Sequence, residues 1–241
     1  DYFTDIIKKI RNVSEDIAIL LDTKGPEIRT GEIKGGKVIL IDNQELIITN
    51  KEIIGDINKI TLFYDDLMEL EVGNKILIDD GLIETEVIKK ESNQLIVEVL
   101  NGGELGSKKT VSIQGHSVNI PFLSEKDKQD IDFGIKNNFD FIAASFVRNA
   151  REVIDLRELL TKKKSKIRVI SKIEHGDAVK NLNEIIDASQ GIMVARGDLG
   201  VEVPLQKVPL IQRDIISRCN ELGRPVIVAT QMLESMRTFP R

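Results

Sequence analysis

The stretch IRVISKIE, residues 167–174, is an apolar run that ends in two charged side chains, Lys172 and Glu174. Residues two apart in a strand point to the same face, so Lys172 and Glu174 should lie side by side. Four further apolar runs, at residues 17–21, 141–147, 191–195 and 225–230, read as buried strands and also end in polar residues. We therefore expect five strands whose carboxyl ends carry the reactive side chains.

Helical patterns accompany these strands. They begin after Ser124, which offers a cap before acidic residues, and recur at residues 150–162, 178–188 and 205–222. Alternating strands and helices predict right-handed parallel crossovers, in a doubly wound sheet or in a (β/α)8 barrel. A doubly wound sheet concentrates its site at one switch point, whereas a barrel collects residues from every strand end. Polar residues end all five strands, which favours a TIM barrel, and five strands make it incomplete.

The segment between residues 31 and 121 has a different sequence pattern. Short β-rich runs at residues 37–41, 45–49, 75–78, 82–88 and 95–99 alternate with turn signals such as Gly35-Gly36 and Asn101-Gly102-Gly103. This pattern predicts an inserted all-β barrel domain. We expect the α/β barrel domain to comprise residues 1–30 and 122–241, and the inserted domain residues 31–121.

Bulk composition restricts the class of protein. The chain has 241 residues, 41% of them hydrophobic, and a net charge of −5, which argues against a nucleic-acid partner. Its apolar runs are strand-length, too short to span a bilayer. The single cysteine, Cys219, cannot form an internal disulfide, and its amphipathic helical setting predicts a buried thiol in a reducing, cytoplasmic protein.

Three segments besides Lys172 and Glu174 could do chemistry. In MVARGDLG, residues 193–200, the glycines let the backbone approach a ligand, and Asp198 could join Glu174 in a Mg²⁺ site. In LDTKGPEIRTG, residues 21–31, Asp22 and Thr23 offer oxygens to a cation and Arg29 suits a phosphate. Thr230 either caps a helix or presents its hydroxyl to the site. Each segment also has a plain reading as an ion pair, a loop or a cap.

Other catalytic classes fit poorly. The only histidines, His116 and His175, have no partner at metal-ligand spacing, and no cluster of cysteine and histidine residues is present. The order expected of a serine hydrolase is also missing. We therefore expect neither a zinc enzyme nor a hydrolase.

Seven segments together resemble the pyruvate kinase family, in its order and over essentially the whole chain. They are LDTKGPEIRTG (21–31), DDGLI (79–83), SEKD (124–127), FIAASFVR (141–148), SKIE (171–174), MVARGDLG (193–200) and ATQMLESM (229–236). The resemblance implies a (β/α)8 barrel with an inserted β-barrel lid. It also implies the last step of glycolysis, phosphoryl transfer from phosphoenolpyruvate to ADP to give pyruvate and ATP, in a cytoplasmic homotetramer.

The resemblance also implies a role for each site residue. Glu174 and Asp198 would hold Mg²⁺ or Mn²⁺, and Lys172 would face the phosphoryl group and stabilise the enolate. Gly197 and Asp198, with Thr230, would receive the substrate carboxylate, and Thr230 would lie near the face where the enolate is protonated. The remaining roles are K⁺ ligation by Asp22 and Thr23, nucleotide phosphate binding by Arg29 and Lys109, and a rim lined by Ser145 and Arg148.

Glu27 and three departures complete the comparison with the family. Glutamate at position 27 marks members that need K⁺. Residues 108–115 read KKTVSIQG rather than KKGVNLPG, which affects the aim of Lys109, and His175 replaces a frequent asparagine. The segments NFSHG and PTRAE do not occur, so we expect a fragment that holds barrel strands three to seven and the lid.

Two other functions stay open from the sequence. A metal-dependent aldolase that handles pyruvate would also use paired carboxylates and a divalent ion. A chain of this extent could also merely bind metal or phosphate without turnover. The inserted β domain and Arg29 favour a nucleotide substrate and hence the kinase.

Overall fold

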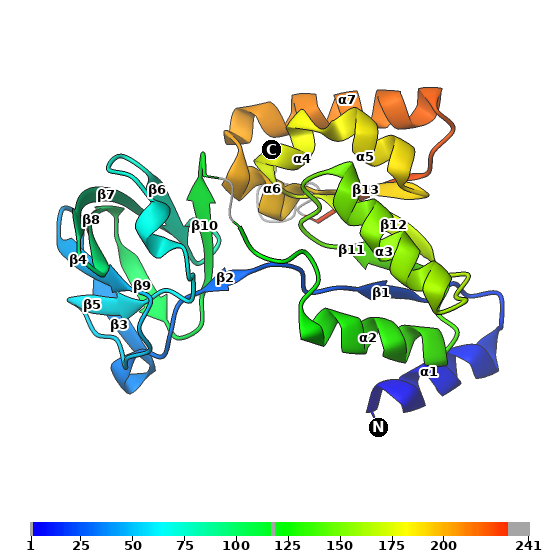
Figure 1. Cartoon of the computed structure of the whole chain (residues 1–241), viewed down its shortest axis with the longest axis horizontal. Coiled ribbons are helices and arrows are strands. Elements are labelled where there is room, and N and C mark those ends of the chain that lie inside the picture. Colours follow the sequence, from blue (N-terminus) through cyan, green and yellow to red (C-terminus); the bar gives the residue numbers. More distant parts are fainter. Residues whose placement is uncertain (1, 117–118, 231–241) are drawn as a thin grey trace, which may run out of the picture. The chain divides into compact units, whose positions relative to one another are not determined.

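The computed structural model describes residues 2–116 and 119–230 (Figure 1). These residues form two compact units. The first, the α/β unit, contains residues up to 26, residues 121–200 and residues from 205 on; the second, the β unit, contains residues 27–120 and 201–204. The domain boundaries expected at residues 31 and 121 stay a prediction, because compactness does not establish that each part folds independently.

The α/β unit is built on one parallel sheet. Its strands are β1 (Leu20–Asp22), β11 (Phe141–Ala144), β12 (Arg168–Ile173), β13 (Gly191–Ala195) and β14 (Val226–Ala229). They lie in the order β1-β11-β12-β13-β14, and every neighbouring pair is parallel. Order in space therefore follows order in the chain, without the reversal that defines a doubly wound sheet. This arrangement agrees with part of a (β/α)8 barrel.

Helices accompany the strands as the sequence predicts (Figure 1). They are α1 (Tyr2–Val13), α2 (Glu125–Lys136), α3 (Ala150–Lys162), α4 (Gly176–Lys180), α5 (Leu182–Ala188), α6 (Arg196–Glu202), the 3-10 turn η3 (Leu205–Lys207) and α7 (Val208–Glu221). Ser124 caps α2 and Asn149 caps α3, each accepting a backbone N–H with its side chain. The helix expected at residues 178–188 is two helices, α4 and α5, which meet at Asn181.

The first predicted strand is shorter and more exposed than expected. Strand β1 begins at Leu20 rather than at Ile17, and it pairs only with β11 among the described strands. Ile17 keeps 42% and Leu20 36% of its surface exposed. The expectation of a buried strand at residues 17–21 is therefore wrong, because an edge strand lacks a neighbour on one side. Ile227 in β14, the other edge strand, is likewise 40% exposed.

The β unit consists of strands with two 3-10 turns, η1 (Lys34–Gly36) and η2 (Leu67–Glu69), besides two residues of α6. Its strands are β2 (Ile28–Arg29), β3 (Lys37–Leu40), β4 (Glu45–Thr49), β5 (Lys59–Thr61), β6 (Lys75–Ile78), β7 (Ile83–Glu91), β8 (Gln94–Asn101), β9 (Gly103–Gly106) and β10 (Thr110–Gln114). Seven of them form one sheet, in the order β2-β10-β6-β7-β8-β4-β5, and β3 pairs with β9.

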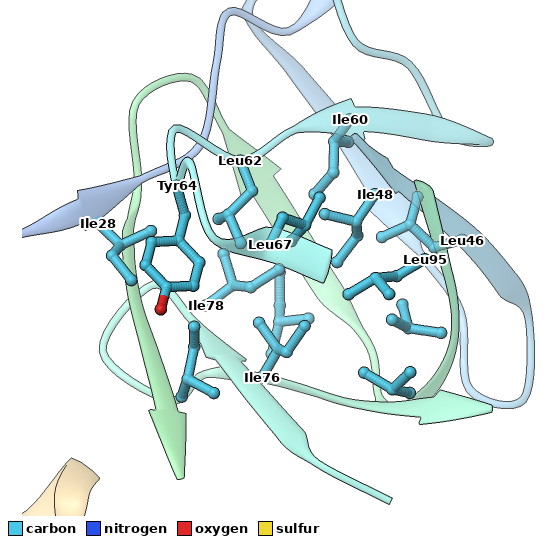
Figure 2. Packing of buried hydrophobic residues seen from close by; sticks show 14 of the residues in the cluster. Ile28, Leu46, Ile48, Ile60, Leu62, Tyr64, Leu67, Ile76, Ile78 and Leu95 are labelled. Atoms are coloured by element: carbon cyan, nitrogen blue, oxygen red, sulfur yellow. The ribbon is translucent and has the colours of Figure 1, made fainter. Parts of the chain in front are cut away.

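The outermost strands of this sheet also meet. The N–H of Gly31 donates to the carbonyl of Thr61 at 3.0 Å, and the N–H of Phe63 donates to the carbonyl of Arg29 at 3.0 Å. Inside lies an aliphatic core that includes Ile28, Leu46, Ile60, Leu67 and Ile76 (Figure 2). Alternation along the strands accounts for this core, because every second side chain points inward.

Two expectations about bulk character can be compared with the described residues. Cys219, on α7, is fully buried, as predicted for a core thiol. None of the helices described here has the length and apolar character needed to cross a membrane.

Candidate active site

Lys172 and Glu174 lie side by side, as the spacing of two predicts. Nζ of Lys172 is 2.9 Å from Oε1 of Glu174. The Lys172 side chain is only 12% exposed, and burial alone would lower its pKa. The negative charges of Glu174 and Asp22 outweigh that effect, so the pKa of Lys172 is raised above its usual value. This lysine is therefore a fixed positive charge at neutral pH.

Strands β1 and β11 complete the surroundings of this ammonium group. Nζ of Lys172 donates to Oγ of Ser145 at 2.9 Å and to Oδ1 of Asp22 at 3.1 Å. The hydroxyl of Ser145 in turn donates to Oδ1 of Asp22 at 3.2 Å. Three neighbouring strand ends thus converge on one charge, as a site at the carboxyl face of parallel strands requires. The sequence placed Ser145 on the rim but did not reveal its contact with Lys172.

Glu174 is an acid with a strongly raised pKa. Its side chain is buried, and desolvation raises its pKa to about 7 even though Lys172 and the N–H of Phe146 favour the ionised form. Oε2 accepts that N–H at 2.7 Å. Oε1 makes no well-aligned hydrogen bond with any described residue, although the Lys172 ammonium is close. This oxygen is therefore held by the ion pair with Lys172 rather than by an aligned hydrogen bond.

Asp198 lies near enough to Glu174 for its negative charge to raise the pKa of Glu174 further. It is exposed, in the first turn of α6. Two carboxylates that repel each other, one with an unsatisfied oxygen, fit a hard divalent cation such as Mg²⁺. The described residues contain no group of three or more acidic, histidine or cysteine side chains that could hold a metal. Substrate oxygens and water would therefore have to supply the other ligands.

Gly197 and Thr230 meet between α6 and the end of β14. The N–H of Gly197 donates to Oγ1 of Thr230 at 3.2 Å, and Thr230 is exposed. Thr230 also has a left-handed backbone, with φ of 60°, which is uncommon outside glycine and asparagine. The hydroxyl of Thr230 and the N–H of Gly197 are thus brought together, two groups to which the family resemblance assigns the substrate carboxylate.

Asp22 and Thr23 offer oxygens of different availability. Asp22 is exposed and carries a carboxylate. Thr23 is buried, and its hydroxyl donates to the carbonyl of Ala143 at 3.3 Å and accepts the N–H of Ser145 at 3.0 Å. The donor set is all oxygen, which fits a hard monovalent cation. The hydroxyl of Thr23 is already engaged in both of these hydrogen bonds.

The loop after β11 is held by a separate ion pair. Arg148 donates through Nε to Glu152 Oε1 at 2.8 Å, and Oε2 of Glu152 accepts the N–H of Arg148 at 2.7 Å. Both side chains are nearly buried. The carbonyl of Arg148 also accepts from the amide of Asn181 at 2.9 Å. Arg148 therefore stabilises the loop that presents Ser145 and Phe146 rather than standing as a free rim cation.

Arg29 and Lys109 belong to the β unit: Arg29 lies in β2, and Lys109 directly precedes β10, the strand that pairs with β2. The N–H of Thr30 donates to the carbonyl of Lys109 at 2.9 Å, and the N–H of Lys109 donates to Oγ1 of Thr30 at 2.9 Å. Each cation has a carboxylate partner: Arg29 contacts Glu27 at 2.8 Å, and Lys109 contacts Asp79 at 2.9 Å. The two residues assigned to one ligand thus lie on neighbouring backbone segments.

Comparison with known proteins identifies the family. Residues 1–241 match the family described as "Pyruvate kinase, barrel domain". Pyruvate kinases of Staphylococcus epidermidis and Staphylococcus aureus are 46% and 48% identical over 98% of this chain. A crystal structure of a pyruvate kinase from Cryptosporidium parvum is 41% identical, with a TM-score of 0.87, over 95% of this chain and 48% of its own.

The chain spans 41% of the length of both staphylococcal relatives. The incomplete TIM barrel expected from the strand ends is confirmed by the family match and by the solved structure. The sequential strand order, the converging side chains and these matches agree, and we conclude that this chain belongs to the pyruvate kinase family.

Proposed function

We propose that the protein containing this chain transfers the phosphoryl group of phosphoenolpyruvate to ADP, giving pyruvate and ATP. The observation that carries the proposal is the buried pair of Lys172 and Glu174, 2.9 Å apart, with the charge of Asp198 close by. Phosphoryl transfer depends mainly on positioning and on neutralising charge. A fixed ammonium group beside two carboxylates is suited to both tasks.

Lys172 is assigned to the transferring phosphoryl group and to the enolate oxygen left behind. Its raised pKa keeps it positive at neutral pH, and its three partners fix its direction. A preorganised charge stabilises an anionic transition state without reorganising during the reaction. Glu174 and Asp198 are assigned to Mg²⁺ or Mn²⁺, which would neutralise substrate oxygens when bound.

The substrate carboxylate is assigned to the N–H groups of Gly197 and Asp198 and to the hydroxyl of Thr230. In support, the N–H of Gly197 already points at that hydroxyl, 3.2 Å away. An incoming carboxylate oxygen could take the place of the hydroxyl as acceptor and also accept from it. Thr230 is also assigned to the face where the enolate is protonated.

Arg29 and Lys109 are assigned to nucleotide phosphates, supported by their adjacency in the β unit. Asp22 and Thr23 are assigned to K⁺, and Glu27, paired with Arg29, marks the K⁺-dependent type of enzyme. We further propose a cytoplasmic, glycolytic homotetramer as the complete protein.

The test is ATP formation from phosphoenolpyruvate and ADP by the complete gene product, coupled to a luminescent readout. ATP should form with Mg²⁺ and K⁺ present and fall sharply without either ion. Absence of ATP formation under all conditions would refute the kinase assignment. Comparable activity in K⁺-free buffer would refute the roles of Asp22 and Thr23 alone.

The isolated 241-residue chain should show negligible turnover. It spans 41% of its relatives, and groups that act as one unit lose activity far more than additively when some are absent. The same ATP assay on the purified chain, beside the complete protein, measures this difference. Robust turnover by the chain alone would show that its residues suffice.

A further inference from the structure

Asp127 is a fully buried acid that the proposed chemistry does not use. It lies in the first turn of α2, in the α/β unit. Burying a carboxylate is costly unless hydrogen bonds satisfy it. Each oxygen of Asp127 accepts two hydrogen bonds, and the two oxygens serve different parts of the chain.

One oxygen serves the helix. Oδ2 of Asp127 accepts the N–H of Ser124 at 3.0 Å and the hydroxyl of Ser124 at 2.6 Å. The N–H of Asp127 donates back to Oγ of Ser124 at 3.1 Å. This reciprocal arrangement is a capping box, with aspartate in the position where glutamate or glutamine is usual. A residue with this role alone would need only one carboxylate oxygen.

The other oxygen serves a turn more than one hundred positions earlier. Oδ1 of Asp127 accepts the N–H of Lys24 at 3.0 Å and the N–H of Gly25 at 3.3 Å. Backbone N–H groups that point at a buried charge are strongly held. The cap of α2 therefore fixes the backbone directly after β1.

That turn follows Asp22 and Thr23. Gly25 has a left-handed φ of 72°, and a Cβ there would lie 3.0 Å from the carbonyl oxygen of Ser145. The turn is thus packed against the end of β11 as well as bonded to Asp127. Asp22, two residues before Lys24, contacts both Ser145 and Lys172. The place of its carboxylate depends on where this turn runs.

We propose that Asp127 is a positioning residue that fixes the turn at Lys24 and Gly25, and thereby the oxygen donors of Asp22 and Thr23 for a monovalent cation. The inference rests on the proposed function in assigning a cation to those donors. Its physical basis is that a cation site binds well when its ligands are held in place before binding. Asp127 bonds the backbone N–H groups of Lys24 and Gly25, so it would act on the donors only through the backbone.

Three variants of the complete protein separate the two roles of Asp127, which are to cap α2 and to hold the turn at Lys24 and Gly25. Ser124→Ala removes the side-chain part of the cap and keeps the bonds to the turn. Asp127→Asn keeps one acceptor oxygen, so the turn can stay bonded, without charge. Asp127→Ala removes the hydrogen bonds of both oxygens. Asp127→Asn keeps the test valid where the alanine variant does not fold.

Three readouts are needed. Hydrogen exchange of the peptide around residues 20–29 measures the turn directly, in the absence of substrates. The concentration of K⁺ that gives half of the maximal rise in Tm measures the cation site without turnover, and the half-saturating K⁺ in the ATP assay is compared with the KM for phosphoenolpyruvate.

For Asp127→Ala we expect exchange at Lys24 and Gly25, and the half-saturating K⁺, to rise by about tenfold or more, the factor that corresponds to one lost charge-assisted hydrogen bond. Asp127→Asn should give an intermediate rise in both. Ser124→Ala should change the half-saturating K⁺ by less than about twofold, even where it lowers Tm, because a cap contributes locally.

Faster exchange with an unchanged K⁺ response would overturn the inference, as would a response in Ser124→Ala equal to that in Asp127→Ala. If neither the Tm nor the turnover of the wild-type protein changes with K⁺ concentration, the cation assignment is refuted, and this inference with it. A wild-type response that every variant retains would refute the inference alone.

Discussion

The ammonium nitrogen of Lys172 lies 2.9 Å from the buried carboxylate of Glu174. The pair is not a surface ion pair of the weak kind, because Glu174 has no exposed surface and Lys172 very little. Desolvation raises the pKa of Glu174 more than the charge of Lys172 lowers it, so the ion pair does not fully offset the cost of burying this carboxylate. The Mg²⁺ and the substrate proposed for this site would bring further charges to the pair.

Replacing Lys172 with methionine should lower kcat by about 10³-fold or more, because the transition state loses its preorganised positive charge. The KM for phosphoenolpyruvate should change much less. The ATP assay on the complete protein measures both constants. Lys37→Met is the matched control, since Lys37 forms an exposed pair with Glu104 in the β unit. A Lys172→Met variant with near-normal kcat would contradict the assignment.

Glu174 should make stability depend on pH. Its pKa rises from 4.5 to about 7 on folding, so the folded state binds this proton more tightly than the unfolded state does. The free energy of unfolding should therefore fall as pH rises from 4.5 to about 7, by at most about 3 kcal/mol from this group. Below the unfolded pKa Glu174 is protonated in both states, so the free energy of unfolding no longer changes with pH through this group.

The Glu174→Gln variant isolates this contribution, since glutamine does not titrate. Urea unfolding of both proteins across this pH range, without divalent ions, gives the difference in free energy at each pH. The wild-type protein should lose stability relative to the variant as pH rises. Parallel curves would show that the pKa of Glu174 is close to that of an exposed glutamate.

The sequence predicted the parts of the fold that depend on local pattern. Periodicity predicted the helix at residues 150–162 with the limits that the structure shows. Both limits are set locally, by the cap at Asn149 and by the turn that follows Lys162. Alternation predicted that Lys172 and Glu174 share a face. It was wrong about burial at Ile17 and Leu20, because burial of a strand depends on a neighbour that local pattern does not specify.

Contacts between distant segments could not be predicted in the same way. Ser145 was recognised as a strand-end residue, but its bond to Lys172 depends on the register of β11 with β12. Asp127 was recognised only as an acidic residue in the first turn of the helix after Ser124, while its bonds to Lys24 and Gly25 join segments separated by about one hundred residues. Nothing in SEKD itself distinguishes a cap from a cap that also anchors a turn.

Gly25→Ala should lower the free energy of unfolding by about 2 kcal/mol, since alanine meets both a left-handed backbone and a close carbonyl oxygen. Gly223→Ala is the matched control: its φ is also positive, at 62°, but nothing lies within 4 Å of the added Cβ. The difference between the two variants in urea unfolding measures the close approach to Ser145. Equal losses would show that the turn is not packed against β11.

Cys219 should react with thiol reagents only after unfolding. Burial raises the pKa of its thiol above 9.0, so the folded protein presents neither a thiolate nor access at neutral pH. Because the folded pKa is the higher one, stability should also fall as pH rises above about 9, where only the unfolded thiol ionises.

As the only cysteine, Cys219 gives an unambiguous signal in a colorimetric thiol assay. Labelling at pH 8 should be slow in buffer and complete in concentrated guanidinium chloride, and its rate should rise with denaturant as unfolding does. The Cys219→Ser variant gives the background. Rapid stoichiometric labelling of the native protein would mean that α7 does not pack against β13 and β14 as the structure has it.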